Sequence, residues 1–439
     1  MKINIYLLPI LVLALFTGQV KAQGEMGLFF SERSIQQTFI NPAYYPTKKV
    51  HIALPNLMVQ GQHDGFKFGD LIQPIAGSDS FMVNPENAIA NMPDQPFLAI
   101  QSSVEPILVS FRAAKLQFTL SSRARTHAYV AYPKDLFRLA WEGNASYVGQ
   151  TMDLAPDFHF QALSEIGLSV ALPVGKNLRL GGRLKYLSGI VDISVSDRML
   201  NLVTQPEYYQ LQFDTRYQIQ TSQLSVTNLF DGEPEAQFNF QPFSSNVGMG
   251  LDLGATYRIK DKVVVSASVL DLGSVKWGAN ANQYGVEGSF SFDGLDAFAL
   301  ATDSTFDPES ILDSLENNFT FTEESIQAYN TILPTKVYLG ATWHLPFKFR
   351  VGGLMHYEFF RGRINQAYML NVNKDFLKFL TLGVNYSVRN QSYNQLGANI
   401  LLKLGPVVWF MGSDNVISFL QPEGARYTNV RMGMTLSLK

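Results

Sequence analysis

Val247-Gly-Met-Gly-Leu-Asp-Leu-Gly-Ala-Thr-Tyr-Arg-Ile259 decides the fold class of this chain. Large apolar residues alternate with small or polar residues along the whole stretch. Only a β-strand presents alternate residues on two opposite faces, so the stretch predicts a strand with one apolar face and one polar face. Gly248, Gly250 and Gly254 all fall on the polar face, which favours close packing at that face over a nucleotide-binding loop.

The same alternation recurs along the rest of the chain. It is found in 117–132, 178–186, 337–343, 349–359, 380–388 and 430–438. The predicted strands that contain these stretches are about ten to seventeen residues long, whereas strands of soluble sandwiches average about five or six. Long strands with one apolar face predict an all-β protein that forms a single transmembrane antiparallel β-barrel. A soluble secreted β-protein is the outside alternative. At roughly 25–30 residues per strand and loop, the length predicts about 14 strands, within a range of about 14–16.

The composition agrees with a membrane barrel and excludes several other classes. Of the 439 residues, 46% are hydrophobic and only 16% are charged, against roughly 25% charged residues in a soluble domain. The 34 basic and 37 acidic residues leave no excess of positive charge, so we expect no nucleic acid as a partner. The chain has no cysteine, which excludes disulfides, thiolate metal sites and a lipidated N-terminal cysteine.

The N-terminus has the features of a secretory signal peptide. Lys2 supplies a positive charge, and the apolar run 5–16 is too short to cross a bilayer as a helix. Val20-Lys-Ala22 then places small or apolar residues where a signal peptidase acts. We therefore expect a signal peptide over 1–22, with an uncleaved anchor as the alternative, and export to the outer membrane.

The rest of the chain is expected to divide into an N-terminal segment, 23–49, and the barrel itself, 50–439. The segment either enters the lumen as a plug or covers the periplasmic rim. Its candidate plug residues are Phe29, Phe30, Phe39 and Tyr44.

The connections between strands differ in length. Short turns at 173–177, 258–262 and 344–348 are predicted on the periplasmic side. Long extracellular loops are predicted at 61–105, 133–157, 223–246 and 293–335, with short helices beginning near Pro85, Pro133 and Pro308. The acidic stretch 302–327 predicts a solvated loop, with a weak calcium site as the alternative. An interfacial aromatic girdle is predicted at Tyr132, Tyr186, Trp277, Trp343, Tyr357 and Trp409.

A group of charged residues falls on the polar faces of three neighbouring predicted strands. If 115–132 pairs with 158–172 and the latter with 177–193, Glu165 lies beside Arg125 on one side and beside Lys185 on the other. A carboxylate between two cations stays ionised and ties three strands together. The functional interpretation is a charged constriction that selects a permeant, and the other interpretation is a structural network. The candidate lumen charge network is Arg123, Arg125, Glu165, Arg183 and Lys185.

The sequence contains no catalytic signature. It has no H-E-x-x-H, no G-x-S-x-G and no phosphate-binding G-x-x-x-x-G-K-[ST]. The six histidines are scattered singly, without a partner at the spacing of metal ligands. We therefore predict no enzymatic activity, no catalytic residues, no cofactor and no metal.

Several blocks of sequence resemble a known family. They are Gln37-Thr-Phe-Ile-Asn-Pro-Ala-Tyr-Tyr-Pro46, His51-Ile-Ala-Leu-Pro-Asn56, Leu184-Lys-Tyr-Leu-Ser-Gly189, Val269-Leu-Asp-Leu-Gly273 and Leu333-Pro-Thr-Lys-Val337. These blocks are similar to a Bacteroidota family of outer-membrane β-barrels that is known only as a domain of unknown function. More distantly, the Asn41-Pro-Ala43 block resembles type IX secretion-associated barrels, and the long strands are similar to long-chain fatty-acid transporters. The resemblance implies an outer-membrane barrel and transfers no catalytic residues.

Two functions are consistent with these observations. The first is a channel or transporter for a small or hydrophobic solute. The second is a non-transporting structural barrel associated with secretion or surface-polymer machinery. Outer-membrane lipid is an expected partner in both cases, with a small hydrophobic solute in the first and secretion-machinery proteins in the second. An open lumen would favour the channel, and a filled lumen would favour the structural barrel.

Overall fold

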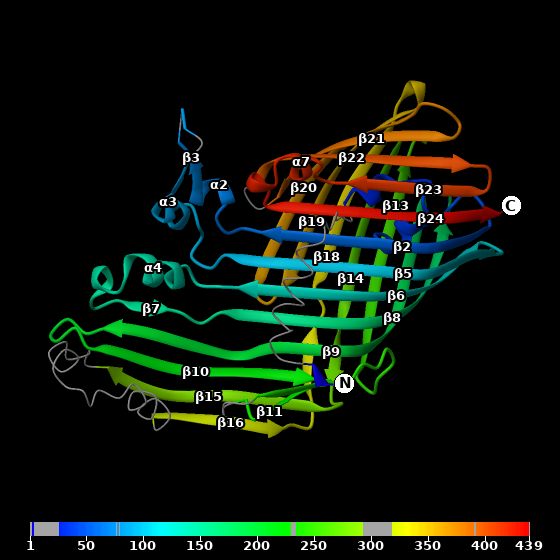
Figure 1. Ribbon diagram of the computed structural model, residues 1–439. Helices are drawn as coiled ribbons and strands as arrows, with labels where there is room; N and C mark the ends of the chain where they lie inside the picture. The colour runs from blue at the N-terminus through cyan, green and yellow to red at the C-terminus, as the bar shows by residue number, and fades with distance from the viewer. Residues whose placement is uncertain are drawn as a thin grey trace.

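The computed structural model describes residues 2–3, 26–75, 77–78, 80–229, 234–292, 318–389 and 392–438. These residues form a closed antiparallel barrel with 14 strand positions (Figure 1). The all-β barrel prediction is therefore confirmed. The expected cleavage site after Ala22 and the predicted helix at Pro308 lie outside the described residues, as does most of the acidic stretch 302–327.

Most strand positions hold a single strand. These strands are β2 (Val50–His63), β5 (Phe97–Ala113), β6 (Leu116–Ala131), β8 (Asp157–Val174), β9 (Leu178–Thr204), β19 (Phe349–Phe360), β20 (Arg363–Asp375), β21 (Leu380–Arg389), β22 (Ser392–Leu404), β23 (Val407–Ser413) and β24 (Tyr427–Leu438). The ring closes where β2 pairs with both β5 and β24.

Besides the position of β8, which the short strand β7 (Thr151–Asp153) continues along β9, three positions hold two or three strands in line. They are β10 (Leu211–Ser222) with β13 (Val247–Ile259), β14 (Val263–Trp277) with β15 (Ala281–Phe292), and β16 (Phe319–Ser325) with β17 (Tyr329–Ile332) and β18 (Thr335–His344). The 27-residue strand β9 pairs with β13 over its first half and with β10 over its second half. β10 and β13 therefore lie end to end beside the same strand, β9.

The remaining elements are short. They are strands β1 (Lys2–Ile3), β3 (Ile72–Pro74), β4 (Phe81–Val83), β7 (Thr151–Asp153), β11 (Leu224–Thr227) and β12 (Glu235–Phe238), helices α2 (Phe68–Leu71), α3 (Pro85–Ala90), α4 (Lys134–Glu142) and α7 (Ile417–Leu420), and 3-10 helices η1 (Gly27–Phe30), η2 (Ile35–Phe39), η3 (Ala145–Tyr147), η4 (Pro346–Lys348) and η5 (Pro422–Gly424). In the described ranges, no helix has the length and apolar character needed to cross a membrane.

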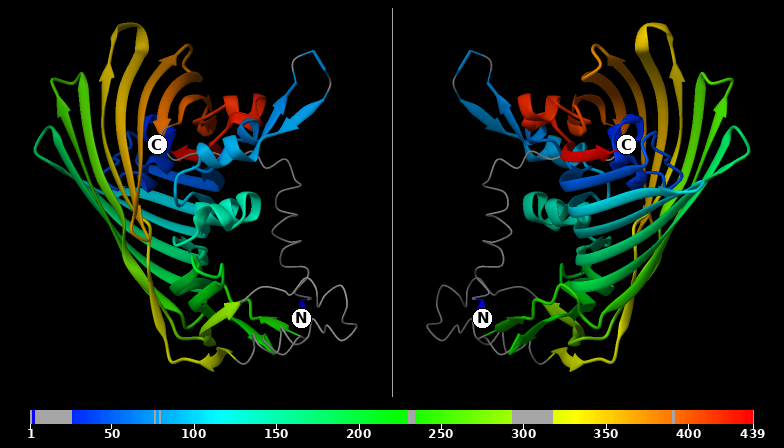
Figure 2. Two further views of the ribbon diagram at one scale, coloured as in Figure 1. Left: turned by 90° about the vertical axis from the view of Figure 1, so that its left-hand side faces the viewer. Right: turned by 90° about the vertical axis from the view of Figure 1, so that its right-hand side faces the viewer.

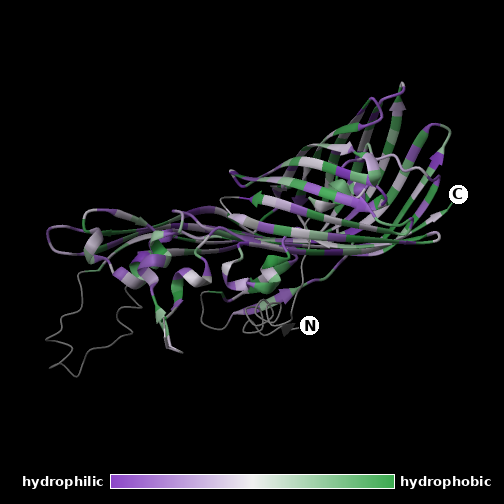
Figure 3. Ribbon diagram, turned by 90° about the horizontal axis from the view of Figure 1, so that it is seen from above, coloured by the Kyte–Doolittle hydropathy of each residue, from purple (hydrophilic) through white to green (hydrophobic). Residues whose placement is uncertain are grey.

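The two faces of the wall differ in polarity, as Figure 3 shows by the alternation of hydrophilic and hydrophobic residues along the strands. On β20, Leu370 is 65% exposed, whereas its neighbours Met369 and Asn371 are 2% and 1% exposed. Leu184 and Val384 are further large apolar residues on the outer wall. An apolar outer wall around a closed hydrogen-bonded barrel is the arrangement of a transmembrane β-barrel.

The two ends of the barrel differ. The short-turn end carries the turns 114–115, 175–177, 260–262 and 405–406, and the long-loop end carries 64–96 and 132–156. Figure 1 shows α2, α3 and α4 gathered at the long-loop end, and Figure 2 shows the β3–β4 hairpin projecting from it. The helices expected near Pro85 and Pro133 are present, and the side chain of Asn84 caps the first of them.

The prediction that 223–246 is an extracellular loop between two wall strands is wrong. These residues leave the wall between β10 and β13 and carry the β11–β12 hairpin. Leu224 and Phe238 pack beside Ile190 and Val191 of β9. A period of two does not reveal when a strand changes its neighbour, so the alternation alone predicted two separate wall strands here.

The predicted register of β6, β8 and β9 is also wrong, by two residues at each ladder. Glu165 lies opposite Arg123 on β6 and opposite Leu187 on β9. The β8–β9 turn is centred on Lys176, one residue later than the prediction, and the β6–β8 connection contains α4 and β7. A shift of two leaves each side chain on the same face, so the charged residues still point into the lumen.

A closed wall predicts resistance to detergent. We expect the folded chain, purified from membranes, to migrate faster on a gel in dodecyl sulfate when unboiled than when boiled, because the wall strands form a closed ring of backbone hydrogen bonds. The measurement is a heat-shift series between 25 and 100 °C. Identical mobility at all temperatures, together with solubility in the absence of detergent, would contradict the membrane barrel.

Candidate functional site: the lumen and the N-terminal segment

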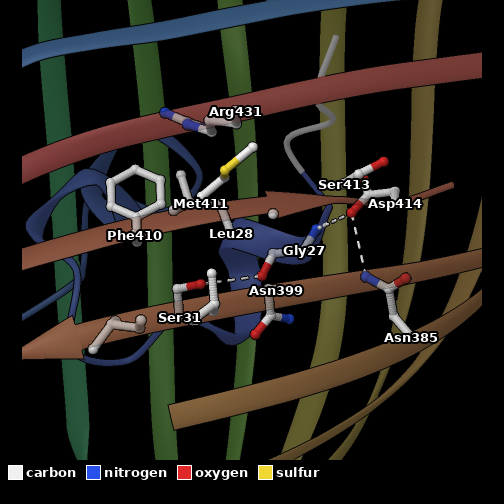
Figure 4. Close-up of a pocket in the computed structure, with 13 residues that line it drawn as sticks. Gly27, Leu28, Ser31, Asn385, Asn399, Phe410, Met411, Ser413, Asp414 and Arg431 are labelled. Atoms are coloured by element: carbon white, nitrogen blue, oxygen red, sulfur yellow. Dashed lines mark hydrogen bonds between the residues drawn. The ribbon is translucent and has the colours of Figure 1, made fainter. Parts of the chain in front are cut away.

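The N-terminal segment, described here over 26–49, lies inside the barrel without joining the wall. It forms η1 and η2 and then reaches β2 at the short-turn end. Figure 4 shows η1 surrounded by wall strands. Leu28, Phe29, Phe30 and Ile40 are 0–4% exposed. The structure therefore places this segment within the lumen, in its short-turn half.

Glycines of the wall receive the bulkiest residues of the segment. A side chain at Gly340 would overlap the ring of Phe29, and one at Gly352 would overlap the ring of Phe30. At Gly254 it would overlap Asn41 and Pro42. The glycines on the polar face of β13 therefore serve close packing in the lumen, as the sequence predicted.

Polar contacts fix the two ends of the segment. The amide of Gly27 donates to Oδ1 of Asp414 at 3.1 Å, and the amide of Asn385 also lies at 3.4 Å from this oxygen (Figure 4). Burial raises the pKa of the Asp414 carboxyl, although Arg389 and these donors act in the opposite direction. Further along, Nδ2 of Asn41 donates to the carbonyl oxygens of Ala255 and Ala267, each at 3.2 Å.

An apolar patch of the inner wall lies beneath the segment. Its side chains are buried and pack against Met26, Leu28, Phe29, Phe30 and Ile40. The inner wall of a water-filled barrel is polar, so an apolar area of this size is unusual there. The apolar patch comprises Leu270, Tyr338, Leu354, Ala367, Met369, Leu401, Val408 and Phe410.

Charged side chains fill the lumen beside the segment. We call these residues the charge cluster, and their side chains are at most 16% exposed. Arg123 pairs with Glu105 at 2.8 Å, and Arg125 lies 3.0 Å from Asp271 and 3.6 Å from Glu165. The charge cluster comprises Glu105, Arg123, Arg125, Glu165, Arg183, Lys185, Asp252, Asp271, Lys336, Glu358 and Arg431.

The five predicted network residues all lie in this cluster. The predicted pair of Arg125 and Glu165 is present, at 3.6 Å, but the other partners differ from those predicted. Arg123 pairs with Glu105 rather than lying diagonal to a carboxylate on β8, and Nζ of Lys185 lies 2.5 Å from both Asp252 and Asp271. The six cluster residues that the prediction missed lie on β5, β13, β14, β18, β19 and β24. Alternation places Asp252 and Arg431 on polar faces, but only the strand order shows that Asp252 meets β9 and that Arg431 meets Glu105 of β5.

Of the predicted plug residues, Phe29 and Phe30 pack on the apolar patch, whereas Phe39 contacts the charge cluster. The ring of Phe39 has the guanidinium carbons of Arg123 and Arg183 at 4.0 and 4.8 Å from its centre, which is cation–π geometry. Arg183 also donates to the carbonyl oxygen of Thr38 at 2.6 Å. The hydroxyl of Tyr44 donates to the carbonyl oxygen of Glu32 at 2.6 Å. The arginines thus contact the segment as well as the wall carboxylates.

Trp277 is not part of an aromatic girdle, contrary to prediction. Its side chain is 0% exposed, faces inward against Gly189 and donates to Thr331 at 2.7 Å. Because β14 and β15 are in line, Trp277 lies in the middle of a strand position rather than at its end. Trp343 and Tyr186 are 53% and 44% exposed on the outer wall, where aromatic belt residues are expected.

The cavities within the packed lumen are small. One of about 30 Å³ borders Gly27, Asp414 and Arg431, and another of about 40 Å³ borders Arg125, His127 and Lys336. Each holds one to a few waters at most. Among the described residues, no group of three or more acidic, histidine or cysteine side chains is placed to hold a metal ion.

Several solved structures are similar to this chain. A crystal structure of a Pseudomonas aeruginosa FadL homologue has a TM-score of 0.44 and 10% identity, over 96% of this chain and 99% of that chain. The Ralstonia pickettii toluene transporter TbuX has a TM-score of 0.43 and 10% identity, over 96% of each chain. The translocator domain of the autotransporter NalP from Neisseria meningitidis has a TM-score of 0.35 and 6% identity, over 90% and 91%.

No curated protein matches the chain. The model of a family of unknown function, DUF5723, matches residues 42–414. This match spans nearly all of the barrel wall and the end of the N-terminal segment. The chain therefore belongs to the family of unknown function DUF5723.

Proposed function

We propose that this chain is an outer-membrane channel for a small hydrophobic solute, closed by its N-terminal segment. The observation that carries the proposal is the apolar patch beneath the segment. If the segment moves, the patch is exposed within the lumen. An apolar surface next to polar walls favours solutes that gain by leaving water.

The construction of the wall supports a movable plug. Every wall strand is paired with wall neighbours, and the N-terminal segment contributes no strand to this circuit. The segment can therefore leave its place without breaking a backbone ladder. Its contacts with the wall are side-chain hydrogen bonds, cation–π contacts and apolar packing, which exchange more readily than paired strands.

Arginines of the charge cluster make polar contacts that hold the segment in its place in the lumen. Arg183 donates to Thr38, and Arg123 and Arg183 flank the ring of Phe39. Both arginines also pair with wall carboxylates, Glu105 and Asp252. They keep these partners when the segment leaves, so opening does not leave an isolated buried charge.

A second candidate is a non-transporting barrel that serves secretion or surface-polymer machinery. The filled lumen favours it, because the segment and the charge cluster leave cavities of only about 30 and 40 Å³ among those described above. In this candidate the segment is a permanent internal support, and the β3–β4 hairpin and α4 at the long-loop end are available to partners. The two candidates differ in whether the segment has to move.

Loosening the plug tests the channel. A methyl group in Gly352→Ala overlaps the ring of Phe30, whereas in Gly353→Ala the nearest atom is Cδ2 of Leu370 on the outer wall, at 3.8 Å. Overpacking costs about 1–3 kcal/mol, so we expect Gly352→Ala to raise entry of the hydrophobic fluorophore N-phenylnaphthylamine into cells about fivefold or more. Gly353→Ala is the control and leaves entry unchanged. Equal entry in both variants would contradict a movable plug.

Fixing the plug is the converse test. The chain has no cysteine, and a Cβ built at Gly254 lies 3.0 Å from Cγ of Asn41, where the sulfur of a cysteine at residue 41 would stand. We expect oxidation of an Asn41→Cys/Gly254→Cys pair to abolish solute entry and reduction to restore it, because the disulfide joins the segment to β13. A Ser110→Cys/Thr119→Cys pair joins two adjacent wall strands and should have no effect. If solute entry is the same whether the first cysteine pair is oxidised or reduced, the result favours the structural barrel.

Neutralising the central carboxylate tests the two interpretations of the charge cluster. Glu165 is 2% exposed and lies by Arg125. Glu165→Gln should lower the free energy of unfolding by roughly 1–3 kcal/mol, because Arg125 loses one of its two neighbouring carboxylates and keeps Asp271. Thermal unfolding in detergent measures this loss, and Glu207→Gln in the exposed turn 205–210 is the control. A structural network predicts unchanged ion selectivity in planar bilayers, whereas a changed selectivity would identify a constriction.

A further inference from the structure

We propose that the short-turn end of the barrel binds the headgroups of anionic phospholipids through a ring of lysines and arginines. The ring occupies the entry to β2 and the six turns β5–β6, β8–β9, β13–β14, β18–β19, β20–β21 and β22–β23. Its partner is the membrane leaflet that surrounds this end of the wall. The proposal is independent of whether the barrel transports a solute.

Every connection at the short-turn end carries at least one lysine. The connections, with the strand residues that flank them, span 44–50, 111–117, 173–180, 257–264, 342–350, 373–380 and 402–407. Backbone hydrogen bonds between neighbouring connections, from Arg258 to Asn177 at 2.9 Å and from His344 to Lys262 at 2.7 Å, show that they follow one another around the barrel. The bases in these ranges, which we call the basic rim, are Lys48, Lys49, Arg112, Lys115, Lys176, Arg179, Arg258, Lys260, Lys262, Lys348, Arg350, Lys374, Lys378 and Lys403.

Acidic residues do not balance the basic rim. The seven ranges contain two of them, Asp261 and Asp375, against fourteen lysines and arginines. Asp375 is buried, 3.0 Å from Arg350 of the rim and 2.7 Å from Arg33 of the N-terminal segment. The segment also brings Glu32 to this end, so it adds one charge of each sign. The excess of bases at the short-turn end therefore remains.

The lysines of the turns are open to the surroundings. Lys115, Lys176 and Lys378, on three turns spread around the ring, are exposed. Within the described residues, their ammonium groups have neither a hydrogen-bond acceptor nor a carboxylate partner. A lysine ammonium is a compact charge with three donors, which suits a phosphate oxygen. These side chains are therefore available to phosphate groups outside the wall.

The other end of the barrel has the opposite charge. The loops 64–96 and 132–156 contain eight acidic residues and three lysines and arginines. The excess of bases is thus a property of one end rather than of the whole surface. Because the short turns of outer-membrane barrels face the periplasm, the basic rim adjoins the inner leaflet, which consists of phospholipid.

Exposed aromatic side chains set the depth of the basic rim in the membrane. Phe347, next to Lys348, is 87% exposed, and Phe376 and Phe379, on either side of Lys378, are 52% and 45% exposed. Aromatic side chains of membrane proteins gather at the level of the lipid headgroups. The neighbouring lysines have long flexible stems that extend along apolar surface toward charged groups. Their ammonium groups therefore reach the phosphates.

The distribution of the bases favours lipid over a protein partner. A typical protein partner buries about 800 Å² on each side of an interface, so it covers one part of a surface. The basic rim instead continues around all seven connections, with exposed apolar residues between its lysines. The surrounding leaflet contacts the whole circumference and offers both phosphates and acyl chains. Clustered bases at a membrane surface attract anionic lipids in particular.

The first experiment counts the lipids that stay on the chain. The full chain is reconstituted in vesicles of equal parts phosphatidylglycerol and phosphatidylethanolamine, extracted in a non-ionic detergent and measured by native mass spectrometry. We expect at least about three times as much bound phosphatidylglycerol as phosphatidylethanolamine, because each rim base attracts the anionic headgroup. Lys115→Glu/Lys176→Glu/Lys378→Glu, the rim reversal, should bring this ratio to about one.

A matched variant carries the same change of charge elsewhere. Lys67→Glu/Arg216→Glu/Lys276→Glu reverses three exposed bases outside the basic rim and should keep the wild-type ratio. A heat-shift gel establishes that each variant is folded. If the rim reversal prevents folding, the milder Lys115→Gln/Lys176→Gln/Lys378→Gln takes its place and should lower the ratio by at least about a third.

The second experiment measures the unfolding temperature of the chain in dodecyl maltoside micelles. Added phosphatidylglycerol should raise this temperature by at least about 3 °C, because a lipid that binds only the folded chain stabilises it. Phosphatidylethanolamine should not raise it. The rise should shrink in 1 M NaCl, where the Debye length is about 3 Å, and should be absent in the rim reversal.

Three kinds of result would overturn the proposal. Equal retention of the two phospholipids by the wild type, or equal loss of the preference in the rim reversal and the matched variant, would remove the role of the rim. Retention of lipopolysaccharide in place of phosphatidylglycerol, in chain purified from cells, would assign the rim to the other leaflet. An acidic protein that the rim reversal releases, with the lipid ratio unchanged, would assign it to a protein partner.

Discussion

Closure of the wall is the constraint on which the rest of this structure depends. A membrane-spanning sheet cannot leave an edge exposed to lipid, so the first strand, β2, has to pair with the last, β24. A ring of 14 strands is wider than the small barrels of about eight strands, whose interior wall side chains fill. The lumen of this barrel therefore needs additional material, and the N-terminal segment and the charge cluster provide it.

The N-terminal segment and the charge cluster, the two fillings of the lumen, have different roles. Apolar residues of the segment cover the apolar patch, which would otherwise face water. The charge cluster fills the lumen with side chains long enough to meet across it. Their ion pairs offset the free-energy cost of burying the charges. Phe39 joins the two fillings, because its ring lies against Arg123 and Arg183 while its backbone belongs to the segment. The position of the segment and the geometry of the cluster are thus coupled through this ring and through the hydrogen bond from Arg183 to Thr38.

The sequence predicts the wall well because a period of two is a local property. Each strand shows its two faces in its own sequence. On β20, for example, the buried Met369 and Asn371 alternate with the exposed Leu370 and Val372. The partners that side chains meet across the lumen, in contrast, are not a local property of the sequence. Nothing near Arg123 in the sequence indicates Glu105 or Arg431 as its partners, because their meeting depends on closure and on the register at every ladder. The same limit explains why the prediction for Trp277 is wrong. Its strand, β14, is followed in line by β15, and the alternation does not show this continuation.

The attachment of the segment determines how it can leave. Residue 49 leads directly into β2 at the short-turn end, and Nζ of Lys48 donates to the carbonyl oxygen of Ser437 at 2.8 Å. This anchor keeps the segment at a high effective concentration near its site, so that the closed state is favoured without tight individual contacts. The hydrogen bond between Gly27 and Asp414 lies near the other end of the described segment. In the proposed channel, withdrawal of the segment toward the short-turn end, where it is anchored, would make the apolar patch accessible from the same side.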